Sequence, residues 1–173
     1  MSNYHKDLAS AVSENLLKIR KQNLRKSFQI ISQQKHRLER VAIINKVVYI
    51  NDASSINANA TYFAMKSLRK PIVWIAGGDD KNTNYHELLP LIRVKVQTII
   101  MIGKNNDKLL SVFENEVNEI LEAGTMEEAV RLARSLSYGG TRVLLSPAAL
   151  PDEKFSTIVE RGELFIKAVN ELK

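Results

Sequence analysis

Residues 69–82, RKPIVWIAGGDDKN, indicate the fold of this chain more strongly than any other stretch. Pro71 precedes five consecutive apolar residues, 72–76, which are too few to span a membrane and too apolar for a strand exposed on one face. We interpret them as a buried parallel strand. Two glycines end it, and two aspartates and Lys81 follow its carboxyl end, the edge at which open α/β sheets bind ligands. The alternative interpretation is a glycine turn followed by solvated charges.

Helical and strand-like patterns alternate along the rest of the sequence. The expected helices cover residues 8–33, 57–68, 85–94, 107–113, 125–138 and 152–172. The expected strands cover residues 41–44, 47–50, 72–76, 98–102, 119–121 and 142–145, the first two joined as a hairpin. The alternation predicts an α/β fold: a doubly wound, mostly parallel, Rossmann-like sheet that begins with a β-hairpin and follows a helical N-terminal arm. We expect residues 1–35 to form the arm and residues 36–173 the α/β domain.

The composition is that of an ordinary globular protein. With 173 residues, 45% hydrophobic and 25% charged, the chain supports one good core. It has no apolar run near 18 residues and its N-terminus is polar, so we expect neither a membrane span nor a signal peptide. The lack of cysteine excludes disulfides and thiolate metal sites and is compatible with the cytoplasm, where we expect the protein. Three scattered histidines predict no metal site.

The net charge of +6 comes largely from the first 40 residues. Eight lysines and arginines lie between residues 18 and 40, interspersed with apolar residues in a pattern typical of an amphipathic helix. We expect this arm to fold back on the α/β domain, to self-associate or to bind a protein partner. It lacks aromatic interleaving and any nucleic-acid motif, which disfavours nucleic-acid binding.

Three blocks of sequence resemble the C-terminal domain of the Mur ligase family, most closely its D-glutamate-adding branch. The first block is HRLE at 36–39 with YIND at 49–52; the second is VWIAGGDDK at 73–81; the third is LLSPA at 144–148 with ERG at 160–162. They occur in the family's order and at about its spacing, and the resemblance covers roughly the whole chain. It implies the same α/β fold, and it implies that residues 2–35 correspond to the end of the family's central, ATP-binding domain.

Mur ligases form an acyl phosphate from a carboxylate and ATP, and an amine then attacks it. The family keeps the phosphate loop, the magnesium carboxylates and a modified lysine in its N-terminal and central domains. The 173 residues contain no G-x-x-x-x-G-K-[ST] motif, and Gly103-Lys104 lacks the upstream glycine. We therefore expect no catalytic residue, metal site or cofactor in this chain, with ATP and magnesium used only if a partner domain supplies their site.

The resemblance assigns roles to three residues. It implies that Arg37 and Asp52 serve the nucleotide side of the site and that Lys81 helps to bind the incoming amino acid. Each has a structural alternative: Arg37 pairing with Glu39, Asp52 capping the helix near Asn57 or bracing its turn, and Lys81 forming a solvated cluster with the neighbouring aspartates.

Other acceptor positions depart from the family pattern. Ser54 stands where the family has lysine, and Ile56 where it has a threonine that contacts substrate. Pro151 replaces a hydroxyl donor, Asp152 an apolar residue and Ile158 an aromatic one. Because a carboxylate ligand needs charge-assisted donors, these changes disfavour D-glutamate, and the charge of Asp152 would repel it.

Three functional hypotheses follow. The first is a non-catalytic binding or scaffold module derived from a peptidoglycan-precursor amino-acid ligase. The second is a partial ATP-dependent amide ligase that acts in trans with a separate ATP-binding domain. The third is a small nucleotide- or anion-binding module that uses Arg37, Asp52 and Lys81. We expect these residues and the Ser146-Pro147 turn to meet at one edge of the sheet, where they bind an anion weakly.

Overall fold

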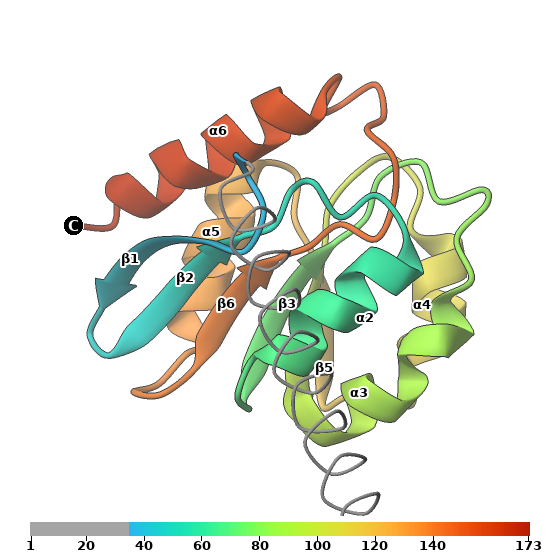
Figure 1. Ribbon diagram of the computed structural model, residues 1–173, viewed down its shortest axis with the longest axis horizontal. Helices are drawn as coiled ribbons and strands as arrows, with labels where there is room; N and C mark the ends of the chain where they lie inside the picture. Colours follow the sequence, from blue (N-terminus) through green and yellow to red (C-terminus); the bar gives the residue numbers. More distant parts are fainter. Residues whose placement is uncertain (1–34) are drawn as a thin grey trace, which may run out of the picture. The chain divides into compact units, whose positions relative to one another are not determined.

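The computed structural model describes residues 35–173, which form one compact unit (Figure 1). The helix expected at 8–33 and its proposed contacts lie outside the described residues. A six-stranded sheet has the order β1 (Glu39–Ile44), β2 (Val47–Asn51), β6 (Arg142–Leu145), β3 (Ile72–Ala76), β4 (Val96–Met101) and β5 (Glu119–Glu122). Only β1 runs antiparallel, to β2, and the other neighbouring strands are parallel. The mostly parallel sheet that begins with a hairpin is therefore confirmed.

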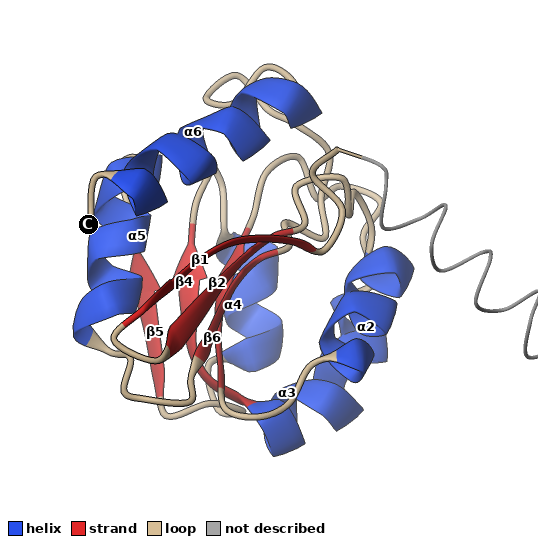
Figure 2. Ribbon diagram, turned by 60° about the vertical axis from the view of Figure 1, so that its left-hand side comes forward, coloured by secondary structure: helices blue, strands red, loops and turns tan. Residues whose placement is uncertain are grey.

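Helices cover both faces of the sheet, as the doubly wound prediction requires (Figure 2). One face carries α5 (Met126–Ser135) and α6 (Ile158–Asn170). The other carries α2 (Ala58–Ser67), the 3-10 turn η1 (Tyr85–Leu88), α3 (Leu89–Lys95) and α4 (Asp107–Phe113). All five residues of β3 are buried, Val73 and Ile75 in the first core and Ile72, Trp74 and Ala76 in the second. The central strand is therefore buried on both faces, as its sequence predicts.

Local chemistry sets the ends of several elements. Asn45 and Lys46 both have positive φ, 50° and 64°, which suits the tight turn between β1 and β2. Asn57 caps α2 by accepting the Ala60 N–H. Thr125 caps α5 by accepting the Glu128 N–H, and the Glu128 carboxylate accepts the Gly124 N–H, so both residues hold the start of the helix.

The start of the last helix was predicted wrongly. α6 begins at Ile158 with Thr157 as its cap, and not near residue 152. The side chain of Asp152 accepts the backbone N–H groups of Lys154 and Phe155, at 3.0 and 3.1 Å. Such local bonds compete with helical ones, so the segment before Thr157 forms a loop. Within residues 35–173, no helix is long and apolar enough to cross a membrane.

Candidate functional site at the carboxyl edge of the sheet

The carboxyl ends of the parallel strands β2, β3, β4 and β6 meet at one edge of the sheet. Backbone hydrogen bonds join the loops that leave β3 and β6. The Gly77 N–H donates to the Pro147 carbonyl at 3.0 Å, and Asp79 and Leu150 exchange two bonds at 2.9 and 3.1 Å. This edge is where the sequence predicts the ligand site.

Asp52 forms the buried part of this edge. It is 1% exposed, and its carboxylate accepts hydrogen bonds from the Ser55 and Ser146 hydroxyls at 2.5 and 2.8 Å and from the Leu38 N–H at 3.2 Å. Burial raises the pKa of Asp52, and these hydrogen bonds and the charge of Arg37 oppose the rise. The sequence offered two structural roles for Asp52, capping α2 or bracing its turn. Because Asn57 caps α2, Asp52 has the bracing role.

Arg37 lies half-buried in the segment that leads into β1. Its charge helps to keep the neighbouring Asp52 ionised. Among residues 35–173 Arg37 forms no ion pair, so the pairing with Glu39 that the sequence offered as an alternative is absent there. The residue that approaches Glu39 is His36, whose Nδ1 lies 3.7 Å from Oε2.

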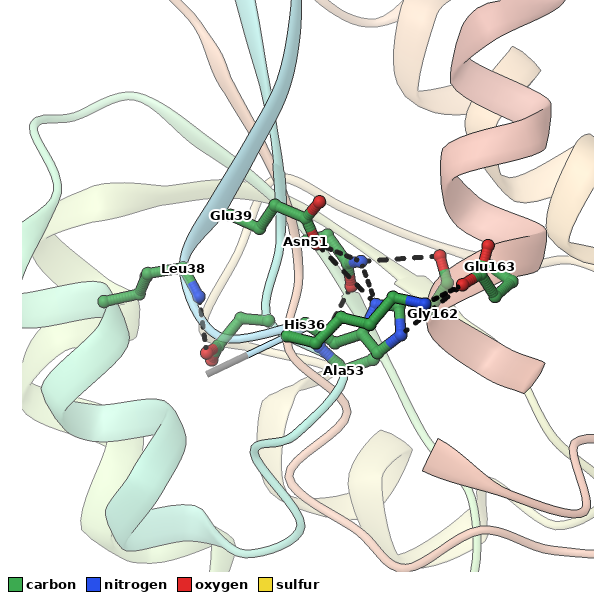
Figure 3. Close-up of polar contacts among 9 residues, drawn as sticks. His36, Leu38, Glu39, Asn51, Ala53, Gly162 and Glu163 are labelled. Carbon is green, nitrogen blue, oxygen red and sulfur yellow. Dashed lines mark hydrogen bonds and ion pairs between the residues drawn. The ribbon is translucent and has the colours of Figure 1, made fainter. Parts of the chain in front are cut away.

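A buried polar cluster anchors the segment that carries Arg37 (Figure 3). The Asn51 amide donates to His36 Nδ1 at 2.8 Å and also approaches Glu39 Oε2 at 3.3 Å and the Gly162 carbonyl at 3.4 Å. Because the amide nitrogen is the donor, Nδ1 accepts, and neutral His36 carries its proton on Nε2. A Cβ on Gly162 would lie 2.4 Å from His36 Nδ1, so only glycine lets α6 approach the ring. Sequence reasoning missed this cluster, although His36 and Asn51 adjoin the two predicted residues.

Lys81 lies at the same edge but apart from Asp52. Its side chain is 85% exposed, with Nζ 3.7 Å from a carboxylate oxygen of Asp79. It borders a hollow of about 380 Å³ and a smaller one of about 110 Å³. Neither hollow is lined by Arg37 or Asp52. The predicted residues thus share an edge without forming one pocket.

Two of the replaced acceptor positions share a hollow with Lys81. Ile56 lines the smaller hollow and Asp152 the larger one. Ser54, which stands in the place of a family lysine, has a buried hydroxyl without a hydrogen-bond partner in the described part of the chain. The hollows therefore offer few charge-assisted donors to a carboxylate.

A buried guanidinium joins the two sides of the edge. Arg161 is fully buried, and its Nη2 donates to the Ala53 carbonyl at 3.1 Å and to the Ala149 carbonyl at 3.3 Å. Burial lowers its pKa to about 10, so it stays protonated at neutral pH. Gly78 packs against it, because a Cβ there would lie 3.2 Å from Nη1 and 2.4 Å from the Leu150 carbonyl. The sequence indicated Arg161 as part of a fold motif, and not as this junction.

The sequence model of the Mur ligase glutamate ligase domain matches residues 36–149. The chain belongs to the Mur ligase family. It is 44% identical over 165 residues to the UDP-N-acetylmuramoylalanine–D-glutamate ligase (MurD) of Christiangramia forsetii, covering 95% of this chain and 37% of that enzyme. With the corresponding enzyme of Porphyromonas gingivalis it shares 35% over 169 residues, covering 98% and 38%. The chain thus spans little more than a third of the length of these relatives.

Two solved ligase structures share the fold. Folylpolyglutamate synthase from Thermotoga maritima aligns with a TM-score of 0.54 and 12% identity over 82% of this chain and 32% of that one. The MurF ligase from the same organism, in complex with ADP, aligns with a TM-score of 0.52 and 14% identity over 82% and 33%. At these identities the likeness concerns the fold alone.

Proposed function

We propose that residues 35–173 form a binding module that derives from the C-terminal domain of a MurD-type ligase and is not catalytic by itself. The module keeps the nucleotide side of the family's site and has lost the D-glutamate side. We infer from the MurD-type relatives that this role belongs to the synthesis of peptidoglycan precursors. A cytoplasmic location belongs to the same proposal, and the cysteine-free sequence is compatible with it.

The contrast between Asp52 and Lys81 carries this proposal. Asp52 is buried within three hydrogen bonds, and the one from the Leu38 N–H ties it to the segment that carries Arg37. Lys81 is an exposed lysine whose charge already faces Asp79. An exposed lysine that is already paired with an acid does not give a dicarboxylate the fixed geometry that specific binding needs.

Nucleotide or anion binding is the activity that this geometry favours. Arg37 is a half-buried cation whose charge acts on Asp52, and its guanidinium is the group at this edge that would contact an anion. Asp52, Asp79 and Asp80 weaken the positive field at the edge. We therefore expect millimolar affinity, about 4 kcal/mol, for ADP or phosphate.

The alternative is a partial ligase that acts in trans. The 173 residues carry no phosphate-loop motif, so in this case the ATP and magnesium site would come from residues outside this chain. The intact Asp52 network favours this alternative because a retained nucleotide side suits a partner that brings ATP. Association through the basic segment within residues 8–33, with a protein partner or a second copy, remains a proposal that rests on the sequence pattern.

Turnover measurements separate the two proposals. The purified 173-residue chain is incubated with ATP, magnesium, UDP-N-acetylmuramoylalanine and D-glutamate, and phosphate release is followed. We expect no release above the blank. Magnesium-dependent release that Lys81→Ala abolishes would contradict the non-catalytic proposal.

The same assay is then repeated with separately produced N-terminal and central domains of a MurD relative. We expect mixing to add nothing to the rate of those domains alone. D-glutamate-dependent release that appears on mixing and is lost with Asp52→Asn would establish the ligase acting in trans and overturn our preference.

A further inference from the structure

The loop between β6 and α6 carries a carboxylate that the family pattern lacks. The two carboxylate oxygens of Asp152 accept hydrogen bonds from different loops. Oδ1 accepts the N–H groups of Lys154 and Phe155, at 3.0 and 3.1 Å, and so folds its own loop. Oδ2 accepts the Lys104 N–H at 3.1 Å, which ties this loop to the one that follows β4. Three backbone donors therefore hold the carboxylate in place.

This carboxylate lies close to the turns that follow β3 and β4. A Cβ built on Gly103 would be 3.0 Å from Asp152 Oδ2 and 3.0 Å from the Gly78 nitrogen, so both glycines border the same small space. The buried guanidinium of Arg161 feels the charge of Asp152, which counteracts part of the effect of burial on its pKa. An anion at this point is thus stabilised by backbone N–H groups and by a buried cation.

Both lysines that line the larger hollow already face an acid of this chain. The exposed ammonium groups of Lys81 and Lys104 pair with Asp79 and Glu153, and exposed pairs of this kind exchange partners at little cost. Asp152 differs because its carboxylate is fixed by three backbone bonds. The acids that line the hollow outnumber the lysines four to two.

We propose that Asp152 is the specificity-determining residue of the larger hollow: it acts as a built-in carboxylate that occupies the anion position and excludes a free dicarboxylate. This inference rests on the proposed function, because Asp152 gives a physical reason why the D-glutamate side does not bind D-glutamate. If the charge of Asp152 is removed, the lysines Lys81 and Lys104 and the positive charge of Arg161 together can bind a carboxylate in this hollow.

The test is a titration of the full 173-residue chain with D-glutamate, followed by the amide shifts of Gly78, Lys81 and Lys104. Asp152→Asn keeps a carbonyl oxygen for the Lys154 and Phe155 N–H groups but removes the charge. We expect it to bind D-glutamate at least ten times more tightly than the wild type. D-glutamine, which lacks the side-chain carboxylate, should bind the variant more weakly than D-glutamate does.

Glu153→Gln is the matched control, since it removes a neighbouring acid from the same hollow without touching the strand ends. Its affinity for D-glutamate should stay within threefold of the wild type. Asp152→Ser, whose hydroxyl also accepts the loop N–H groups, should repeat the gain of Asp152→Asn and guards against a folding defect in one variant. Affinities of both Asp152 variants within threefold of the wild type, or an equal gain in Glu153→Gln, would overturn the inference.

A parallel ADP titration keeps this result apart from the proposed function. ADP should move the amides near Asp52 equally in the wild type and in Asp152→Asn. If ADP binds but Asp152→Asn does not bind D-glutamate more tightly than the wild type, the inference about Asp152 is wrong and the proposed function stands. A lack of ADP binding in both proteins counts against the proposed function, whatever D-glutamate does.

Discussion

The nucleotide-side and acceptor-side regions lie at the same edge of one sheet but are held in opposite ways. Asp52 is 1% exposed and accepts three hydrogen bonds, whereas the Lys81 side chain is 85% exposed and faces Asp79 across 3.7 Å. A buried polar group holds its place because the loss of a partner leaves it unsatisfied, while an exposed ion pair contributes little. Burial therefore fixes the surroundings of Asp52, whereas substitutions around Lys81 cost little stability.

The largest effect should come from breaking the junction between the two regions. Arg161→Ala removes the donor shared by the Ala53 and Ala149 carbonyls and opens a cavity. We expect the free energy of unfolding to fall by about 3 kcal/mol, measured by urea denaturation. Arg131→Ala, on the exposed face of α5, is the control and should change it by less than about 0.5 kcal/mol. Equal losses in the two variants would show that the junction does not matter.

A smaller loss should follow from disturbing the nucleotide side alone. In Gly162→Ala the new Cβ would lie 2.4 Å from His36 Nδ1 and displace the ring from Asn51. Overpacking costs about 1–3 kcal/mol, which exceeds the gain in helix propensity of about 1 kcal/mol over nearly all of that range. At so short a contact we expect a net loss of about 1–2 kcal/mol. Thermal unfolding should show a lower Tm.

Gly139→Ala is the control for the glycine test, because its added Cβ would meet no atom closer than 3.5 Å. Its free energy of unfolding should stay within about 0.5 kcal/mol of the wild type. A Gly162→Ala protein as stable as this control would mean that His36 can move without cost, and that the nucleotide side is less fixed than the geometry indicates.

The pH dependence of stability offers a third comparison. Burial raises the pKa of Asp52, so the folded state holds its proton more tightly than the unfolded state does. The ionised group therefore lowers stability, and this loss develops as the pH rises from the ordinary aspartate range through the folded pKa. Asp52→Asn has no carboxyl at this position, so its stability does not fall for this reason as the pH rises. In urea denaturation, the wild type should gain stability relative to the variant as the pH falls from 7 toward 4.

The exposed Glu119→Gln serves as the control for this titration. Its difference from the wild type should not show the trend that Asp52→Asn shows. A stability difference between wild type and Asp52→Asn that is constant with pH would contradict a raised pKa.

The smallest effect should come from the acceptor side. Lys81→Ala removes an exposed ammonium whose ion partner also lies at the surface. We expect the free energy of unfolding to change by less than about 0.5 kcal/mol. A loss above 1 kcal/mol in urea denaturation would show that Lys81 is structural and would remove the contrast between the two regions.

The sequence predicts the fold well where local patterns and burial agree. The apolar run that begins at Ile72 and the hairpin with its Asn45-Lys46 turn both depend on neighbours in sequence, and the structure has both of them. The late start of α6 depends on which donors the Asp152 side chain finds, and periodicity does not report that choice.

The site was predicted less completely because its contacts join distant parts of the chain. The contact between Asn51 and Gly162 spans 111 residues, and the Arg161 bond to Ala53 spans 108. The family resemblance locates Arg37 and Asp52 at the edge. The separation of Lys81 from these two residues depends on how the loops after β2 and β3 pack. The local sequence pattern of either loop does not predict that packing.

We propose above that this domain keeps the nucleotide side and has lost the acceptor side of its family's site. The most direct test titrates the wild-type chain with ADP and, separately, with D-glutamate while following backbone amide shifts. The account predicts that ADP moves Leu38, Asp52 and Ser55 with millimolar affinity and that D-glutamate produces no saturable change. Saturable D-glutamate shifts at Gly78 and Lys81, with the amide of Asp52 unmoved by ADP, would contradict it.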